Sequence, residues 1–102
     1  MTKRSGTVTK DLMAKQKDIH CSVITPEQQV LDANATAVVI PAHDGQVGIL
    51  FNRAPLLCEL GKGTLRIDTV DEGQKKVRIS GGFAQVLNNE VTVLTERAEE
   101  EA

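Results

Sequence analysis

The sequence contains very few aromatic residues. Trp and Tyr are absent, and Phe occurs twice among 102 residues. Surfaces that stack nucleic-acid bases and cages that hold small ligands are commonly built from aromatic rings. The composition therefore argues against both kinds of site, and we expect no nucleic acid among the partners.

Long apolar runs and a cysteine framework are also missing. The apolar stretches are only a few residues long, which is too short to cross a bilayer, and no charged-then-apolar leader opens the sequence. The two cysteines, Cys21 and Cys58, are too few for a disulfide framework and suit a reducing compartment. We therefore expect neither direct membrane insertion nor secretion.

The charges are unevenly distributed along the chain. Residues 1–17 carry five cations against one anion, residues 18–95 carry six against nine, and residues 96–102 carry one against four. A basic segment can bind nucleic acid or an anionic membrane, but this one is short and lacks aromatic residues, so a solvated arm is favoured. We expect a flexible arm over 1–17, one folded domain over 18–95, and an acidic tail or helix stub over 96–102.

The apolar residues that are present favour β-structure. Val and Ile supply 17 side chains, and they recur in short alternating segments separated by Pro, Gly and Asn turns. No helical pattern separates these segments, which excludes parallel βαβ units. The fold predicted is all-β, a ten-stranded β-sandwich or flattened barrel. The segments that carry the pattern are 19–24, 29–32, 36–40, 47–51, 56–60, 64–70, 75–80, 83–87 and 90–94. We expect Pro41 to end a strand, Gly81-Gly82 to bend the chain, and Asn88-Asn89 to form the two-residue turn of the last hairpin.

The strand pattern also predicts which side chains form the core. Apolar residues at alternate positions of a strand face the same side of the sheet. The residues expected to lie between the two layers are Ile40, Leu65, Ile67, Val77, Ile79 and Val93.

Two short segments resemble catalytic or nucleotide-binding motifs without meeting their requirements. A phosphate-binding loop needs Gly five positions before the Gly-Lys pair, but Leu56 stands there relative to Gly61-Lys62, and Gly63 follows. A nucleophile elbow at Ser80 needs Gly two positions earlier, where Arg78 stands. We interpret both segments as turns or bends between strands, and we expect no catalytic residue and no cofactor.

The possible metal ligands do not form a recognisable set. His20 and Cys21 are adjacent, so in a strand their side chains point to opposite faces. His43, Asp44 and Cys58 show none of the spacings typical of zinc sites. We therefore expect no metal site.

One longer stretch is more specific than composition. The run from Val39 to Leu57, Val-Ile-Pro-Ala-His-Asp-Gly-Gln-Val-Gly-Ile-Leu-Phe-Asn-Arg-Ala-Pro-Leu-Leu, resembles the signature of the epsilon subunit of F-type ATP synthase. The resemblance continues upstream in 23–27 and downstream in 61–67, 80–83 and 91–94, with order and spacing kept from about residue 18 to 98.

The resemblance implies a fold, a location and a mechanical role. The family's N-terminal domain is a ten-stranded β-sandwich that sits on the gamma subunit against the ring of membrane c subunits and turns with them as part of the rotor. It couples ion-driven rotation to the gamma shaft, and ATP chemistry belongs to other subunits. A member would be peripheral, at the cytoplasmic face of the inner (plasma) membrane, within the complex.

The resemblance also implies four interface residues. Asp44 and Gln46, in the turn around Gly45, would face the polar loops of the c-ring, and Thr25 and Arg53 would lie toward gamma. Gln46 stands where many members have Glu, which replaces a charged contact with a hydrogen bond. Arg53 replaces a common His and removes a group that titrates near neutral pH.

Two further departures concern Phe51 and the end of the chain. Phe51 stands where Pro is frequent. The sequence stops where the family's C-terminal helical hairpin begins, and in some members that hairpin inhibits ATP hydrolysis or binds ATP.

The alternative to the rotor interpretation is a β-sandwich protein-binding module of another complex.

Overall fold

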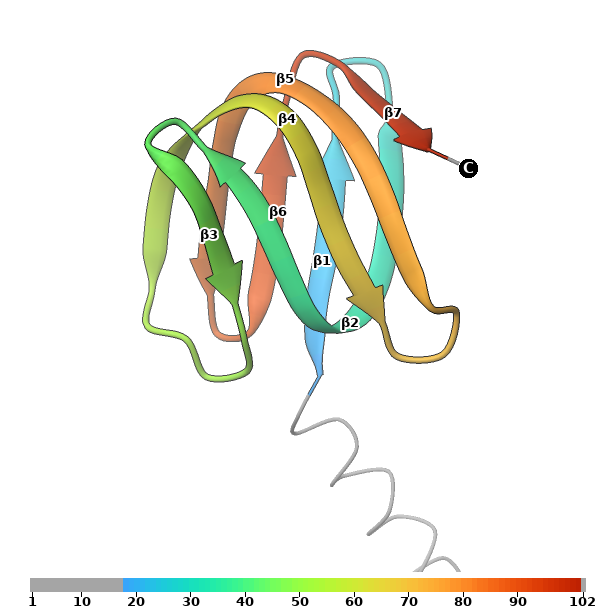
Figure 1. Cartoon of the computed structure of the whole chain (residues 1–102), viewed down its shortest axis with the longest axis vertical. Helices are drawn as coiled ribbons and strands as arrows, with labels where there is room; N and C mark the ends of the chain where they lie inside the picture. Colours follow the sequence, from blue (N-terminus) through green and yellow to red (C-terminus); the bar gives the residue numbers. More distant parts are fainter. Residues whose placement is uncertain (1–17, 102) are drawn as a thin grey trace, which may run out of the picture.

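The computed structural model describes residues 18–101, and these form seven β-strands and no helix. Figure 1 shows the long strands β4 and β5 arching across the molecule, with β3 on one side and β1 and β6 behind. The strands are β1 (Ile19–Ile24), β2 (Gln29–Ala42), β3 (Gly45–Ile49), β4 (Leu56–Thr69), β5 (Gln74–Leu87), β6 (Glu90–Leu94) and β7 (Ala98–Glu101). The all-β prediction is confirmed.

The sheet closes on itself. Its strand order is β1-β6-β5-β4-β2-β3, and β1 also pairs with β2, so β1, β6, β5, β4 and β2 form a ring. Every pairing is antiparallel except β1 with β6, which is parallel. Closure leaves few free strand edges, because each strand of the ring pairs with a neighbour on both sides. β3 and β7 lie outside the ring, and each pairs with one strand only. This is the flattened barrel that the sequence predicts.

The structure has seven strands rather than ten, because three pairs of the nine predicted segments are joined into longer strands and β7 is added. β2, β4 and β5 each have 14 residues and each joins two of the predicted short strands. Pro41, predicted to end a strand, lies inside β2 opposite Gln46 of β3. Proline has no N–H to donate to a neighbouring strand. It is tolerated here because the pairing of β2 with β4 is irregular between Val39 and Ala42.

Glycines bend β4 and β5 together. The predicted turn at Gly61–Gly63 is a continuation of β4, and Lys62 pairs with Ser80 of β5. The bend predicted at Gly81–Gly82 is present, with φ of 74° and 111°. In β4, the side chains that face outward are at odd-numbered positions before this bend, Leu57 and Glu59, and at even-numbered positions after it, including Lys62 and Arg66. One β4–β5 ribbon therefore contributes an outer surface to both halves of the molecule.

Residues 96–101 correct the helix-stub prediction. Ala98–Glu101 form β7, which pairs antiparallel with residues 76–79 of β5. A two-turn helix without tertiary contacts is marginal, whereas a vacant stretch of strand edge offers backbone partners at once. Residues 1–17, expected to form the flexible arm, lie outside the described part of the chain.

The core lies inside the ring. All six residues predicted to be buried are at most 2% exposed. They pack with residues of β1 and β6, including Ile19, Val23 and Val91. The predicted two-residue turn between β5 and β6 is also present, with Asn88 and Asn89 at positive φ.

Candidate partner-binding surfaces

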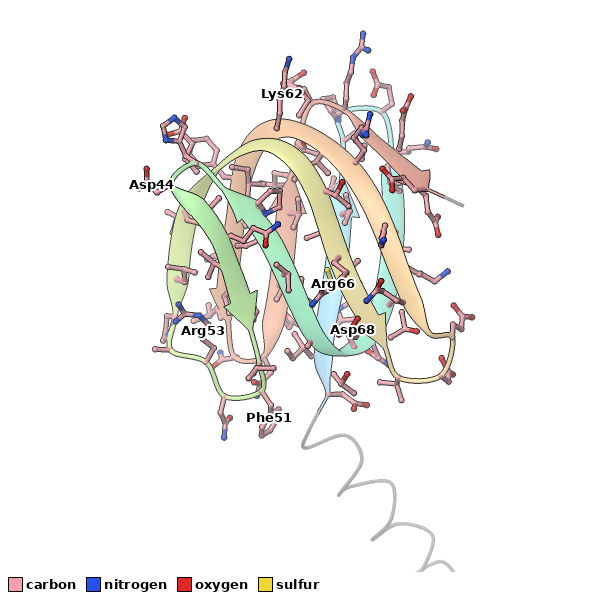
Figure 2. The ribbon with its side chains drawn as sticks, in the orientation of Figure 1. Asp44, Phe51, Arg53, Lys62, Arg66 and Asp68 are labelled. Carbon is pink, nitrogen blue, oxygen red and sulfur yellow. The ribbon has the colours of Figure 1, made fainter. Side chains whose placement is uncertain are left out.

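Asp44 and Gln46 project from the turn between β2 and β3. Gly45 has a φ of 133°, and the carboxylate of Asp44 is fully exposed, with Oδ1 3.4 Å from Nδ1 of His43. Gln46 is also exposed and lies on β3 at the edge of the sheet. Figure 2 shows Asp44 at the tip of this turn, pointing away from the body of the molecule. The structure therefore brings these two predicted residues together.

Arg53 lies at the other end of β3, in the loop that leads into β4. Its amide donates to the carbonyl of Leu50 (3.2 Å), and the amide of Asn52 donates to Oδ1 of Asn89 (2.6 Å). The second bond fastens this loop to the β5–β6 turn. Figure 2 places Arg53 and Phe51 at the opposite end of β3 from Asp44.

Thr25 lies between β1 and β2, where its hydroxyl is already used. Its Oγ1 donates to the carbonyl oxygen of Gln28 (3.1 Å) and accepts from the Gln28 amide (3.3 Å). Thr25 is buried, whereas Pro26 and Glu27 in the same loop are exposed. A partner that reached this loop would therefore meet Pro26 and Glu27 before the Thr25 hydroxyl.

An exposed apolar surface that was not predicted from the sequence lies between Arg53 and Thr25. We call it the apolar face; it lies on the outside of β4, β5 and β6. Its members are Leu57 (71% exposed), Phe83 (55%), Leu87 (45%) and Leu94 (51%). Phe83 pairs directly with Leu94, and the sequence signal for both is an apolar residue at an outward position of a strand.

The apolar face extends toward both predicted loops. At one end, a groove of about 410 Å³ is lined by Phe83, Leu94, Pro26 and Thr25. At the other end, a groove of about 230 Å³ is lined by Pro55, at the end of the Arg53 loop, together with Leu57 and Leu87. Gln85 and Thr92 lie between these apolar side chains. Exposed apolar side chains that gather on one face of a domain are typical of a protein-binding surface.

Beyond the glycine bend, the same ribbon is basic. Lys62 and Arg66 of β4 and Lys76 and Arg78 of β5 occupy outward positions, and Arg66 pairs with Lys76 across the two strands. Asp68 lies 3.9 Å from Arg66. Figure 2 shows Lys62 above the bend and Arg66 beside Asp68 further along β4. The outer surface of the ribbon therefore divides into an apolar half and a basic half.

His20 and Cys21 lie on β1 and Cys58 lies on β4, and their surroundings shift nearby pKa values. Nε2 of His20 contacts Oδ1 of Asp32, and the hydrogen bond from Gln29 together with that contact holds the pKa of Asp32 below its usual value. Burial raises the pKa of the Cys21 thiol to about 12. Burial also raises the pKa of Cys58, against the opposing effect of Arg53. Both thiols are therefore protonated at neutral pH.

Between residues 18 and 101, no group of three His, Cys, Asp or Glu side chains could hold a metal ion. Within the same range, no helix has the length and hydrophobicity needed to cross a membrane. What the described residues do present is two exposed loops and the apolar face.

Comparison with known proteins identifies the domain. The family model for the β-sandwich domain of the ATP synthase delta/epsilon chain matches residues 18–101. The ATP synthase epsilon chain of Synechococcus sp. (strain JA-2-3B'a(2-13)) is 49% identical over 77 residues, which cover 76% of this chain and 56% of the relative. The chloroplastic epsilon chain of Guillardia theta is 45% identical over 82 residues, and these cover 80% and 62% respectively. The chain thus spans about 60% of the length of these curated relatives.

Solved structures with the same fold come from mitochondrial ATP synthases. A chain in the Euglena gracilis OSCP/F1/c-ring structure has a TM-score of 0.77 and 23% identity, covering 82% of this chain and 54% of that one. A chain in the Tetrahymena thermophila central stalk/c-ring structure has a TM-score of 0.68 and 17% identity, covering 82% and 67%. At these identities the similarity establishes the fold. Because the family model matches residues 18–101, the chain belongs to the family of ATP synthase delta/epsilon chain β-sandwich domains.

Proposed function

We propose that this chain is a non-catalytic rotor subunit of an F-type ATP synthase, which links the gamma subunit to the c-ring and couples ion-driven rotation to ATP synthesis or hydrolysis. Its relatives are ATP synthase epsilon chains. The structures that share its fold are described as an OSCP/F1/c-ring assembly and a central stalk/c-ring assembly. As a part of that complex without a spanning helix in residues 18–101, it would be peripheral, at the cytoplasmic face of the inner membrane.

The observation that carries the proposal is the position of the apolar face. It lies between Thr25 and Arg53, the two residues that the family resemblance directs toward gamma. Exposing Leu57 and Phe83 to water is unfavourable, and burying them against a partner removes that cost. The apolar face is therefore the surface that we assign to gamma.

The turn at Asp44 and Gln46 is assigned to the c-ring. Both residues are exposed on an edge hairpin, and the hairpin lies at the opposite end of β3 from Arg53. Separate contact regions for gamma and the ring are what a coupling subunit requires. The closed sheet between them would transmit torque, because its strands are hydrogen-bonded around the ring.

The test is calorimetric titration of the chain into purified gamma, with Arg53→Ala as the interface variant. A one-to-one complex at micromolar affinity or better is expected, and Arg53→Ala should weaken it. Asp44→Ala, on the hairpin assigned to the ring, is the matched control and should leave gamma affinity unchanged. If the folded chain does not bind gamma, the binding-module alternative becomes the better interpretation.

A further inference from the structure

The edge of β5 is completed by a strand of unusual composition. One side of β5 pairs with β4 along most of its length. The other side pairs with β6 over residues 83–87 and with β7 over residues 76–79. Without β7, the backbone groups of residues 76–79 on that side would form an open edge, which is a template for another strand. Figure 1 shows β7 lying along this outer edge at the top of the molecule.

The hold of β7 on this edge is weak. The strand has four residues, Ala-Glu-Glu-Glu, and both residue types are depleted in strands. Ala98 is its one residue packed against the core, and the three glutamates are exposed. Short strands with few apolar contacts open more readily than the rest of a fold.

The cations of β5 beside this edge favour an acidic strand. Nζ of Lys75 lies 3.4 Å from Oε2 of Glu100, and Nε of Arg78 lies 3.5 Å from Oε2 of Glu101. Nζ of Lys75 also lies 3.3 Å from Oε1 of Glu72, which is in the turn between β4 and β5. These exposed pairs contribute little stability and weaken in salt, but they favour an acidic strand over a neutral or basic one.

Ala98 leaves space unfilled beside it. A groove of about 430 Å³ runs between β7 and the β1–β2 loop, and Val30 and Gln28 line it together with Ala98. Val30 and Ala98 are both half-buried and pack against the core. A larger apolar side chain at the position of Ala98 would extend toward Val30 and bury more area than a methyl group does.

We propose that the edge of β5 at residues 76–79 is a strand-addition site for an extended acidic segment of a partner protein, and that β7 occupies this site in cis. The partner segment pairs antiparallel with β5. It carries an apolar residue larger than Ala at the position of Ala98. It also carries carboxylates at the positions of Glu100 and Glu101, which reach diagonally to Lys75 and Arg78. This site is separate from the apolar face and from the Asp44 turn, and it does not depend on the rotor function.

The test uses the full chain with its own strand disabled. In an antiparallel ladder, alternate residues direct their N–H to the partner, so Glu99→Pro with Glu100→Pro removes at least one donor to β5. The probe is a fluorescent peptide with the sequence of residues 95–101, followed by anisotropy. We expect the double-proline chain to bind it at least about tenfold more tightly than the native chain, because the edge is no longer occupied. Replacing Ala98 of the peptide by Leu should tighten binding further.

Two controls separate strand addition from charge attraction. A peptide N-methylated at alternate backbone nitrogens keeps its charge but cannot pair, so it should not bind. Arg78→Glu, made in the double-proline chain, should weaken binding of the unmodified peptide. Arg53→Glu, in the loop that leads into β4 and away from β7, should change it little. Equal binding of the N-methylated peptide, or no binding of either peptide to a double-proline chain that is folded by circular dichroism, would overturn the proposal.

Discussion

The α-carbon of Gly82 faces the carbonyl oxygen of Leu94 so closely that no side chain fits between them. A Cβ built on Gly82 overlaps this oxygen and lies 2.9 Å from Cα of Thr95, and Gly82 has a φ of 111°. Two independent constraints, space and backbone conformation, therefore require glycine here. The close approach lets β5 bend beside the end of β6, which brings Phe83 next to Leu94 on the apolar face.

We predict that Gly82→Ala destabilises the domain by more than about 2 kcal/mol, because the new Cβ both clashes and strains the backbone. Gly48→Ala is the matched control, since a Cβ there meets no atom within 4 Å. Urea denaturation followed by circular dichroism measures both. A Gly82→Ala chain as stable as the Gly48→Ala chain would mean that the bend is more adaptable than the structure indicates.

A second pair of variants compares the same chemical change in the two environments of β4. Leu65 is fully buried, whereas Leu57 is 71% exposed. Leu65→Ala should lower the free energy of unfolding by ~2–5 kcal/mol, because it leaves a cavity in the core. Leu57→Ala should change it by less than about 0.5 kcal/mol. Similar losses from both substitutions would place the apolar face inside the fold rather than on its surface.

The residues that were predictable from the sequence are those that obey a local rule. Alternation identified Leu65 and Ile67 as core, and the tolerance of Asn88 and Asn89 for left-handed φ identified the last hairpin. These rules depend only on neighbours along the chain, so no tertiary information was needed.

The failures arose where tertiary pairing overrides local signals. Pro41 and Gly61–Gly63 normally interrupt strands, but here irregular pairing and a bend of the whole ribbon accommodate them. Residues 98–101 favour helix by composition, yet the edge of β5 makes them a strand. The apolar face was missed because it forms only when β4, β5 and β6 lie side by side.

The two thiols should react very differently. Cys21 is fully buried and its pKa is raised to about 12, whereas Cys58 is half-buried. Because the thiolate is the nucleophile, Cys21 should resist iodoacetamide at pH 8 in the folded chain and react only after unfolding. Peptide mass mapping after timed labelling should show Cys58 modified first. Equal labelling of the two residues under native conditions would contradict the buried position of β1.

Asp32 should contribute to acid sensitivity. Its pKa is lowered by the hydrogen bond from Gln29 and by the contact with His20. A carboxyl whose pKa is lower in the folded state stabilises the fold above its unfolded pKa, and this contribution is lost as pH falls through the folded value. The stability difference between the native chain and Asp32→Asn should therefore shrink when urea denaturation is repeated at pH 6, 4 and 3. Gln29→Ala should reproduce part of the effect, and a difference that stays constant below pH 4 would show that these interactions do not favour the ionised form.

The apolar face provides the most direct mutational test of the rotor assignment. Leu57→Glu places a charge where gamma is expected to bury an apolar surface, so gamma affinity should fall by at least about tenfold. Val70→Glu is the matched control, because Val70 is also an exposed apolar residue (46%) but lies in the turn after β4, away from the apolar face. Since both side chains are exposed, neither substitution should change the unfolding midpoint appreciably, which separates loss of binding from loss of fold. If Val70→Glu weakened gamma binding and Leu57→Glu did not, gamma would have to dock on the basic half of the ribbon, and the apolar face would be free for a different partner.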